Sequence, residues 1–266
     1  MTTPAYTWGL TTSANSGPDQ ASCARGLAEA YGGPYLDRGR DSLQALKSKH
    51  ALDYLLVLDR NKHVFLDEPP LHWNPAMSMK RLRRLFEGGQ DLFLSAVSLA
   101  QGDKLLDCTI GLGADALMAA AAVGEAGQVL GLEASPIIAL LTGWGFAHET
   151  SGYDTRKTPF SVLAQRISVL HREALVFLET QPSGSWDVVY IDPMFRAANL
   201  RSSNMNALRA LACHTPFSAA LLMEAQRVCA KRVVLKERWF SPLFARYGAV
   251  REVRSKYGPV AYGIWE

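Results

Sequence analysis

Beyond Gly102, short apolar runs alternate with segments of helical spacing, and this alternation constrains the fold more than any other feature of the chain. The apolar runs comprise residues 105–106, 129–132, 167–170, 188–191 and 233–235. Strands that are separated by helices pair in parallel, and the connecting helices cover both faces of the resulting sheet. The sequence therefore predicts an α/β fold built on a mostly parallel sheet.

The C-terminal tail departs from this alternation. Residues 250–253 and 260–265 form two further runs, and Tyr257-Gly258-Pro259 between them is typical of a turn. We therefore expect an antiparallel hairpin at the end of the sheet, which is unusual for a dinucleotide-binding fold.

The N-terminal part of the chain has a mixed pattern. Its predicted elements are a strand over 6–10, a helix over 19–31 and a hairpin over 54–58 and 64–66. Gly32-Gly33 stops the helix, and Pro69-Pro70 is expected to end the module. We predict a small α/β module over 1–73, with a role in substrate recognition, and a second domain over 74–266.

The composition bounds the class of protein. The 266 residues are 48% hydrophobic, which is enough for one large domain with a small appendage. No stretch approaches the roughly 18 apolar residues of a membrane span, and we expect no secretory signal. The four cysteines form no Cys-x-x-Cys pair, so we expect a cytoplasmic protein without disulfides or a metal site. A net charge of +3 permits a nucleic-acid partner without requiring one.

Residues 105–116 are typical of a strand, a glycine loop and the start of a helix. Gly111 and Gly113 let the backbone turn sharply and approach a ligand closely. Glu133 follows about 20 residues later, at the end of the next predicted strand, where a carboxylate can bind both hydroxyls of a ribose. This arrangement predicts a nucleoside cofactor.

Two acids bear on the identity of that cofactor. The string from Gly111 to Ala116 also satisfies a dinucleotide fingerprint, which leaves an NAD-dependent oxidoreductase open. However, Asp115 lies in the first helical turn, where it would compete with a pyrophosphate for the positive helix end. Asp107 places a second carboxylate by the loop, where it suits the ammonium group of S-adenosylmethionine (SAM). The acids therefore favour SAM.

Asp192-Pro193-Met194-Phe195 follows the predicted strand over 188–191. The Asp192 carboxylate can accept a hydrogen bond from an amine, and the Pro193 carbonyl can be aimed as a second acceptor. Phe195 can stack on a flat ring. This tetrapeptide therefore predicts a clamp for a planar ring that carries an amino group.

A family resemblance rests on three stretches, which are Asp107 to Ala116, Val189 to Phe195 and Arg232 to Lys236. They resemble the bacterial ribosomal RNA methyltransferases that modify guanine N2 in the small subunit. Asn74-Pro75-Ala76-Met77 and Gly131 to Pro136 make the chain more similar still to uncharacterised bacterial relatives of that group. The resemblance covers residues 74 to 240, and the N-terminal module matches only in being a small α/β appendage.

The resemblance implies a Rossmann-like class I methyltransferase fold, with a seven-stranded, mostly parallel sheet that ends in an antiparallel hairpin. It also implies SAM as methyl donor and a nucleobase amine as acceptor, with Asp192, Pro193 and Phe195 as catalytic residues. The expected cofactor-binding residues are Asp107, Thr109, Gly111, Gly113, Asp115, Glu133, Ala134, His171, Glu173 and Asp192. Two departures, Ala114 in place of arginine and Arg196 in place of proline, leave the modified base and its RNA position open.

RNA, either ribosomal RNA or a ribosomal subunit, is the expected partner, because basic side chains near the clamp suit phosphates. The expected substrate-binding residues are Met194, Arg196, Lys236, Lys80 and Arg81. The sequence leaves open whether Lys236 reaches a phosphate or pairs with a nearby acid. Trp186 and Trp239 are expected in the core or at its rim rather than as base platforms.

Three alternatives remain at this point. The first is a methyltransferase for DNA adenine, a protein amide or a small molecule. The second is the NAD-dependent oxidoreductase, and the third is a module that binds nucleoside or RNA without catalysis.

Overall fold

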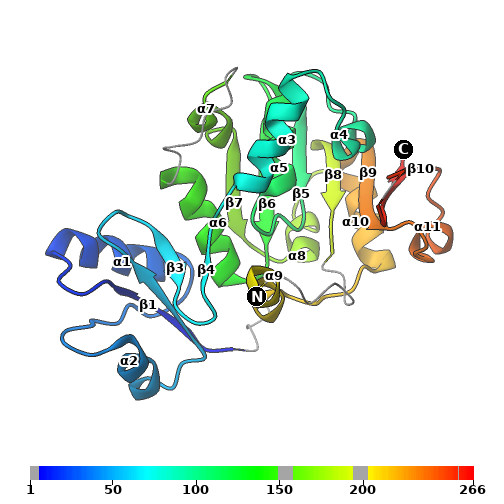
Figure 1. The fold of residues 1–266 in the computed structure, drawn as a ribbon. Coiled ribbons are helices and arrows are strands. Elements are labelled where there is room, and N and C mark those ends of the chain that lie inside the picture. Colours follow the sequence, from blue (N-terminus) through cyan, green and yellow to red (C-terminus); the bar gives the residue numbers. More distant parts are fainter. Residues whose placement is uncertain (1–5, 149–157, 194–202, 257) are drawn as a thin grey trace.

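The computed structural model describes residues 6–148, 158–193, 203–256 and 258–266. The strands form a sheet of four and a sheet of seven (Figure 1). Within these ranges, no helix is long and apolar enough to cross a membrane.

The larger sheet has the strand order β10-β11-β9-β8-β5-β6-β7. Its strands are β5 (Lys104–Asp107), β6 (Gln128–Glu133), β7 (Ile167–His171), β8 (Trp186–Ile191), β9 (Cys229–Arg238), β10 (Arg251–Arg254) and β11 (Val260–Trp265). The neighbouring strands β9, β8, β5, β6 and β7 pair in parallel, whereas β11 pairs antiparallel with both β9 and β10. The expected parallel sheet with a C-terminal hairpin is confirmed, and the carboxyl ends of its parallel strands share one edge.

Helices cover both faces of this sheet, because its central strands carry apolar side chains on both sides. In β8, Val188 and Tyr190 join the core under α3, α4 and α5, whereas Val189 and Ile191 join the core under α8 and α10. The helices of this part are α3 (Ala76–Phe86), α4 (Leu92–Val97), α5 (Ala114–Val123), α6 (Pro136–His148), α7 (Phe160–Ala164), α8 (Ala174–Leu178), α9 (Ser203–Leu211), α10 (Ala219–Val228) and α11 (Leu243–Arg246).

The smaller sheet lies alongside α6 (Figure 1). It consists of β1 (Trp8–Thr12), β2 (Tyr54–Leu58), β3 (Val64–Leu66) and β4 (Leu71–His72), with helices α1 (Pro18–Ala30) and α2 (Leu43–Lys49). One apolar cluster joins this sheet to the larger part, since Leu56 and Leu58 belong to the same core as Ile137 and Leu141 of α6.

Several predicted boundaries differ from the structure, and the strand expected over 6–10 is β1 over Trp8–Thr12. The smaller sheet does not stop at Pro69-Pro70, because the chain continues into β4, which pairs with β3 and lies within residues 1–73. The sequence also predicts a helix from Asp91 to about Ala100, but α4 ends at Val97, since Ser98 adopts a left-handed backbone with φ of 49°. Strand β9 is longer than the apolar run over 233–235, because it is paired on both sides, with β8 and with β11.

Candidate active site

The site is built around the glycine loop between β5 and α5, at the carboxyl edge of the larger sheet. Gly111 and Gly113 have φ angles of +53° and +79°, a region that residues with side chains rarely adopt. A Cβ atom on Gly113 would lie 2.4 Å from the ring of Phe146. The Thr142 hydroxyl of α6 donates to the Gly111 carbonyl at 2.6 Å. The loop is therefore packed closely against α6.

Hydrogen bonds tie this loop to the strand ends on both sides. The backbone N–H of Asp192, just after β8, donates to Thr109 Oγ1 at 2.6 Å. On the other side, the backbone N–H of Gly111 donates to Glu133 Oε2 at 3.2 Å, at the end of β6. The second Glu133 oxygen accepts from the backbone N–H of Ser135 at 2.9 Å. The acids predicted for acceptor and cofactor thus flank one loop.

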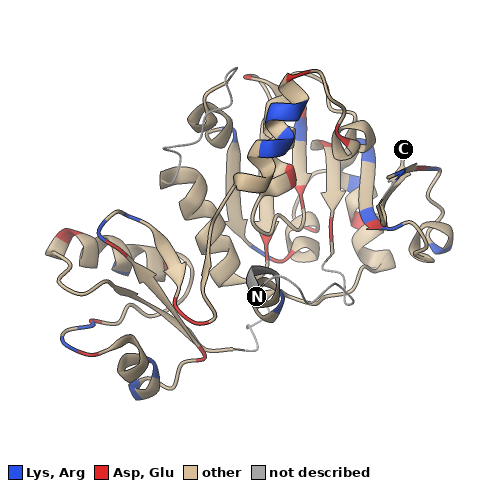
Figure 2. Ribbon diagram, in the orientation of Figure 1, with Lys and Arg blue, Asp and Glu red and all other residues tan. Residues whose placement is uncertain are grey.

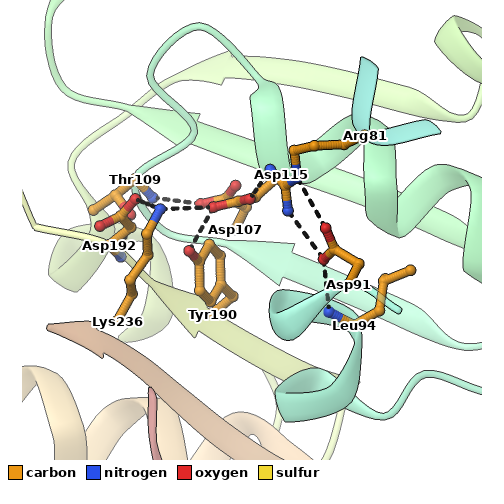
Figure 3. A network of polar contacts seen from close by, with 9 residues as sticks. All are labelled: Arg81, Asp91, Leu94, Asp107, Thr109, Asp115, Tyr190, Asp192 and Lys236. Carbon is orange, nitrogen blue, oxygen red and sulfur yellow. Dashed lines mark hydrogen bonds and ion pairs between the residues drawn. The ribbon is translucent and has the colours of Figure 1, made fainter. Parts of the chain in front are cut away.

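Five charged side chains form a continuous network across the site, namely Asp91, Arg81, Asp115, Lys236 and Asp192 (Figure 3). Lys236 Nζ of β9 lies 2.7 Å from Asp192 Oδ2 and 3.1 Å from Asp115 Oδ2. Arg81 Nη1 of α3 donates to Asp115 Oδ1 at 2.6 Å. The hydroxyl of Tyr190 donates to Asp115 Oδ2 at 2.7 Å. Asp115 is therefore the centre of a network that joins α3, α5, β8 and β9.

Burial and charge act in opposite directions on the acids of this network. Burial acts to raise the pKa of Asp115, but Lys236 and Arg81 outweigh it and lower the pKa to about 2. Burial raises the pKa of Asp192 to about 6, although Lys236 opposes the rise. Burial also raises the pKa of Asp107 well above its ordinary value, and the Asp115 and Asp192 carboxylates add to that rise. Asp115 therefore stays ionised, whereas Asp107 lies in surroundings that favour a cationic ligand.

The acidic side chains beside the glycine loop fit SAM. Asp107 is only 2% exposed, and its carboxylate accepts a hydrogen bond from the backbone N–H of Thr109 at 3.0 Å. A buried carboxylate gains most from a cationic partner, and SAM carries an ammonium and a sulfonium but no phosphate. Glu133, at the adjacent strand end, offers acceptors for ribose hydroxyls. Asp107 and Glu133 are therefore the residues that would hold its charged and ribose portions.

The other predicted cofactor residues lie at the ends of β6 and β7. His171 Nε2 is 3.2 Å from the Ala134 carbonyl oxygen, and the His171 ring stacks on Tyr31 with centroids 6.4 Å apart. Glu173 accepts from the backbone N–H of Val176 at 2.9 Å and so caps α8. Their contacts with a cofactor stay predictions.

The predicted clamp is described only in part. Asp192 and Pro193 are partly buried at the end of β8. Three of its predicted residues lie outside the described ranges, namely Met194, Phe195 and Arg196.

The basic residues predicted to bind substrate differ in their surroundings. Figure 2 shows basic residues, in blue, along α3, and Lys80 on this helix is exposed. Arg81 instead turns inward, and its Nε and Nη2 donate to the two Asp91 carboxylate oxygens at 2.9 and 3.0 Å. Lys236 pairs with acids in the site, which answers the question that the sequence left open. Contacts of these residues with RNA stay predictions.

Sequence reasoning missed two members of the network, Tyr190 and Asp91. A tyrosine within a buried aliphatic strand is a usable signal, because its hydroxyl must find a partner in the core. Asp91 gives a weaker signal, as an N-cap acid that also accepts from the backbone N–H of Leu94 at 3.2 Å. Among the described residues, no group of three or more His, Cys, Asp or Glu side chains is placed to hold a metal ion.

Residues 46–256 match the protein family described as "Putative SAM-dependent methyltransferase". The chain is 31% identical to the uncharacterized protein YpiP of Bacillus subtilis over 256 residues, which are 96% of this chain and 98% of that protein. It is 28% identical to ribosomal RNA small subunit methyltransferase J of Psychrobacter arcticus over 239 residues, 79% of this chain and 77% of the relative.

A solved structure shows a similar fold. The crystal structure of a SAM-dependent methyltransferase from Neisseria gonorrhoeae aligns with a TM-score of 0.66 and 21% identity, covering 97% of this chain and 95% of that one. The family match decides against the NAD-dependent oxidoreductase and confirms the resemblance noted in the sequence. This chain belongs to the SAM-dependent methyltransferases, and SAM is its cofactor.

Proposed function

We propose that this enzyme transfers a methyl group to an exocyclic nucleobase amine, namely guanine N2 in small-subunit ribosomal RNA. The observation that carries this proposal is the position of Asp192 and Pro193, because the Asp192 backbone is hydrogen-bonded to the glycine loop through Thr109. An amine acceptor at this strand end lies next to the cofactor loop. Several relatives are named ribosomal RNA small subunit methyltransferase J, and this supports RNA as the substrate.

SAM, when bound, supplies a methyl group that its sulfonium has already activated. The remaining task of the protein is to hold the acceptor in line, which is worth several kcal/mol of barrier. An exocyclic amine is a weak nucleophile, because its lone pair is delocalised into the ring. In the proposed mechanism, the Asp192 carboxylate and the Pro193 carbonyl accept the two amine hydrogens, which turns the lone pair out of conjugation. The carboxylate also stabilises the positive charge that develops on nitrogen, and it accepts the proton that the methylated nitrogen must lose.

Lys236 fits this mechanism as the residue that orients the Asp192 carboxylate. Its ammonium contacts Asp192 Oδ2, and Asp115 holds the lysine from the other side. A carboxylate has about four acceptor positions, so Asp192 can keep this lysine and still accept an amine hydrogen. Phe195 is the proposed stacking partner for the base, which must leave its helix to enter the site.

The division into a module over 1–73 and a methyltransferase domain over 74–266 is part of the proposal. We propose that the module contributes to substrate recognition. The core shared through α6 supports this role, because it fixes the module beside the carboxyl edge that holds the site.

The Asp192→Ala variant tests the proposed chemistry. We expect it to abolish methyl transfer to ribosomal RNA from cells that lack the gene, while SAM affinity stays within a few-fold. Transfer is measured with labelled SAM, and affinity by calorimetry. Asp187→Ala is a matched control, because Asp187 is an ion-paired aspartate at the opposite end of β8, 3.0 Å from Lys231. Near-full turnover by Asp192→Ala would remove Asp192 from the mechanism.

The substrate class is tested in the same assay with wild-type enzyme. Parallel reactions contain DNA, a protein extract and free metabolites. We expect label in ribosomal RNA alone and, after digestion, in N2-methylguanosine. Label in DNA, protein or a small molecule would overturn the RNA assignment and leave the SAM chemistry intact.

A further inference from the structure

Trp239 and Phe240 form an exposed aromatic pair directly after β9. Their exposed fractions are 52% and 58%, whereas each of the other five tryptophans is at most 8% exposed. Large aromatic side chains are usually buried, and adjacent exposed ones often mark a binding surface. The folded protein therefore presents one tryptophan to solvent, and it stands beside a second exposed ring.

The pair is held by its surroundings rather than projecting from a loose loop. The Trp239 and Phe240 rings are 5.4 Å apart at 89°, so they present two differently oriented faces. The backbone N–H of Trp239 donates to the Pro259 carbonyl at 2.9 Å, which ties this turn to the C-terminal hairpin. The Arg238 guanidinium lies 5.8 Å from the Phe240 ring centroid and places positive charge beside the aromatic faces.

This pair lies at the same sheet edge as the active site. Strand β9 runs parallel to β8, so both strands end at the carboxyl edge (Figure 1). Lys236, which contacts Asp192, is three residues before Trp239. Three extended residues span at most about 11 Å of backbone. A single-stranded nucleic acid with one nucleotide at Asp192 can thus bring a neighbouring nucleotide over the pair.

We propose that Trp239 and Phe240 form a stacking platform for a nucleobase next to the methyl acceptor in single-stranded RNA. This inference rests on the proposed function, and it replaces the expectation that Trp239 is merely a rim residue. Every base has a flat face, so such stacking holds a strand without reading its sequence. The positive charge of Arg238 complements the phosphates on either side. The platform therefore contributes to RNA affinity and not to the chemical step.

The exposure of Trp239 allows a direct test by fluorescence. A single-stranded 12-nucleotide RNA of mixed sequence is titrated into the full-length enzyme, with inorganic polyphosphate as a probe that has charge but no bases. We expect RNA to quench the tryptophan emission and polyphosphate to leave it unchanged. The Trp239→Phe variant should lose the quenching and keep most of its RNA affinity, because an aromatic ring remains.

Removal of both rings tests the contribution to turnover. For the Trp239→Ala/Phe240→Ala double variant we expect KM for ribosomal RNA to rise about tenfold or more, with kcat and SAM affinity unchanged. Met223→Ala is the matched control, because Met223 is 63% exposed on α10 and outside the site.

Three results would overturn the platform. They are an unchanged KM in the double variant, equal quenching by polyphosphate, and a dimer in sedimentation that the double variant dissociates, which would assign the rings to a second copy. Failure of the proposed function is distinguishable, since it appears as absence of label in RNA with wild-type enzyme. The quenching titration still tests the platform in that case, because it measures RNA binding and not methyl transfer.

Discussion

At the scale of single residues, Glu133 links the geometry of the site to its response to pH. Its two oxygens accept backbone hydrogen bonds from Ser135 and Gly111. Burial nevertheless raises the pKa of Glu133 to about 7, because these bonds only partly compensate for the loss of water. A glutamate with this pKa is half protonated near neutral pH, where an exposed one is fully ionised.

SAM affinity should therefore depend on pH. If the ionised Glu133 carboxylate accepts the ribose hydroxyls, affinity falls about tenfold for each pH unit below 7 and is constant well above it. Calorimetric titrations between pH 5.5 and about 8.5 measure this, and Glu133→Gln should bind more weakly with a flat profile. A pH slope that persists in Glu133→Gln would assign the titration to another group.

The raised pKa of Glu133 has the opposite effect on the stability of the fold. The folded pKa of Glu133 is about 7 and its ordinary value is 4.5, so the folded state binds more protons between these pH values. Glu133 thus lowers the free energy of unfolding as pH rises from 4.5 to 7. A rise in pH through this range therefore strengthens SAM binding and lowers the free energy of unfolding through the same carboxyl group.

At the scale of elements, the first turn of α5 decides the shape of the glycine loop. Gly113 begins this helix in a left-handed conformation, with the Phe146 ring of α6 where a Cβ atom would be. Asp115 in the same turn is fixed by Arg81 and Lys236. The close approach of two helices therefore sets the loop that receives the cofactor.

Gly113→Ala should combine backbone strain with a steric clash. We expect it to lower the free energy of unfolding by about 2–4 kcal/mol and to weaken SAM binding strongly. Gly184→Ala is the control, because Gly184 also has a positive φ of +66° but would place its Cβ in open space. It should cost about 1 kcal/mol. Urea denaturation compares the two, and equal losses would show that the Phe146 contact is unimportant.

At the scale of the whole molecule, α6 is shared between the two sheets. Ile137 and Leu141 pack in one cluster with Leu58 of the smaller sheet. Trp144 of α6 donates its indole N–H to the Lys62 carbonyl at 2.6 Å, and Tyr6 Oη lies 2.7 Å from Ser135 Oγ. Neither part can unfold without exposing this apolar surface.

We therefore expect one cooperative thermal transition for the full chain, with equal calorimetric and van't Hoff enthalpies. Leu58→Ala in β2 should lower the free energy of unfolding by about 2–5 kcal/mol. The whole transition should then move to lower temperature, although the residue lies far along the chain from the SAM loop. Met77→Ala is the control, because Met77 is 78% exposed. Calorimetry that resolved two transitions, with only one shifted, would show that the module over 1–73 folds independently.

The elements could be predicted where their signal is local. The hairpin at 54–58 and 64–66 and strand β11 have the predicted bounds, because apolar runs and turn residues are short-range features. The two-residue β4 carried no such signal, and its pairing with β3 supplies what its own sequence lacks. The polar part of β9 was missed for the same reason, since cross-strand hydrogen bonds do not depend on apolar side chains.

The sequence by itself determined the fold class and the glycine loop, and it pointed to Glu133 and Asp192, because each stands at the end of an apolar run that marks a strand locally. Only the tertiary structure decided the partners of these acids. Lys236 reaches Asp115 across 121 positions, a contact that exists because the strand order places β9 beside β8 and β8 beside β5, the strand that leads into α5. The tertiary structure also leaves Trp239 exposed and buries Trp186. Side chains far apart in sequence meet according to sheet order and packing, which no local pattern encodes.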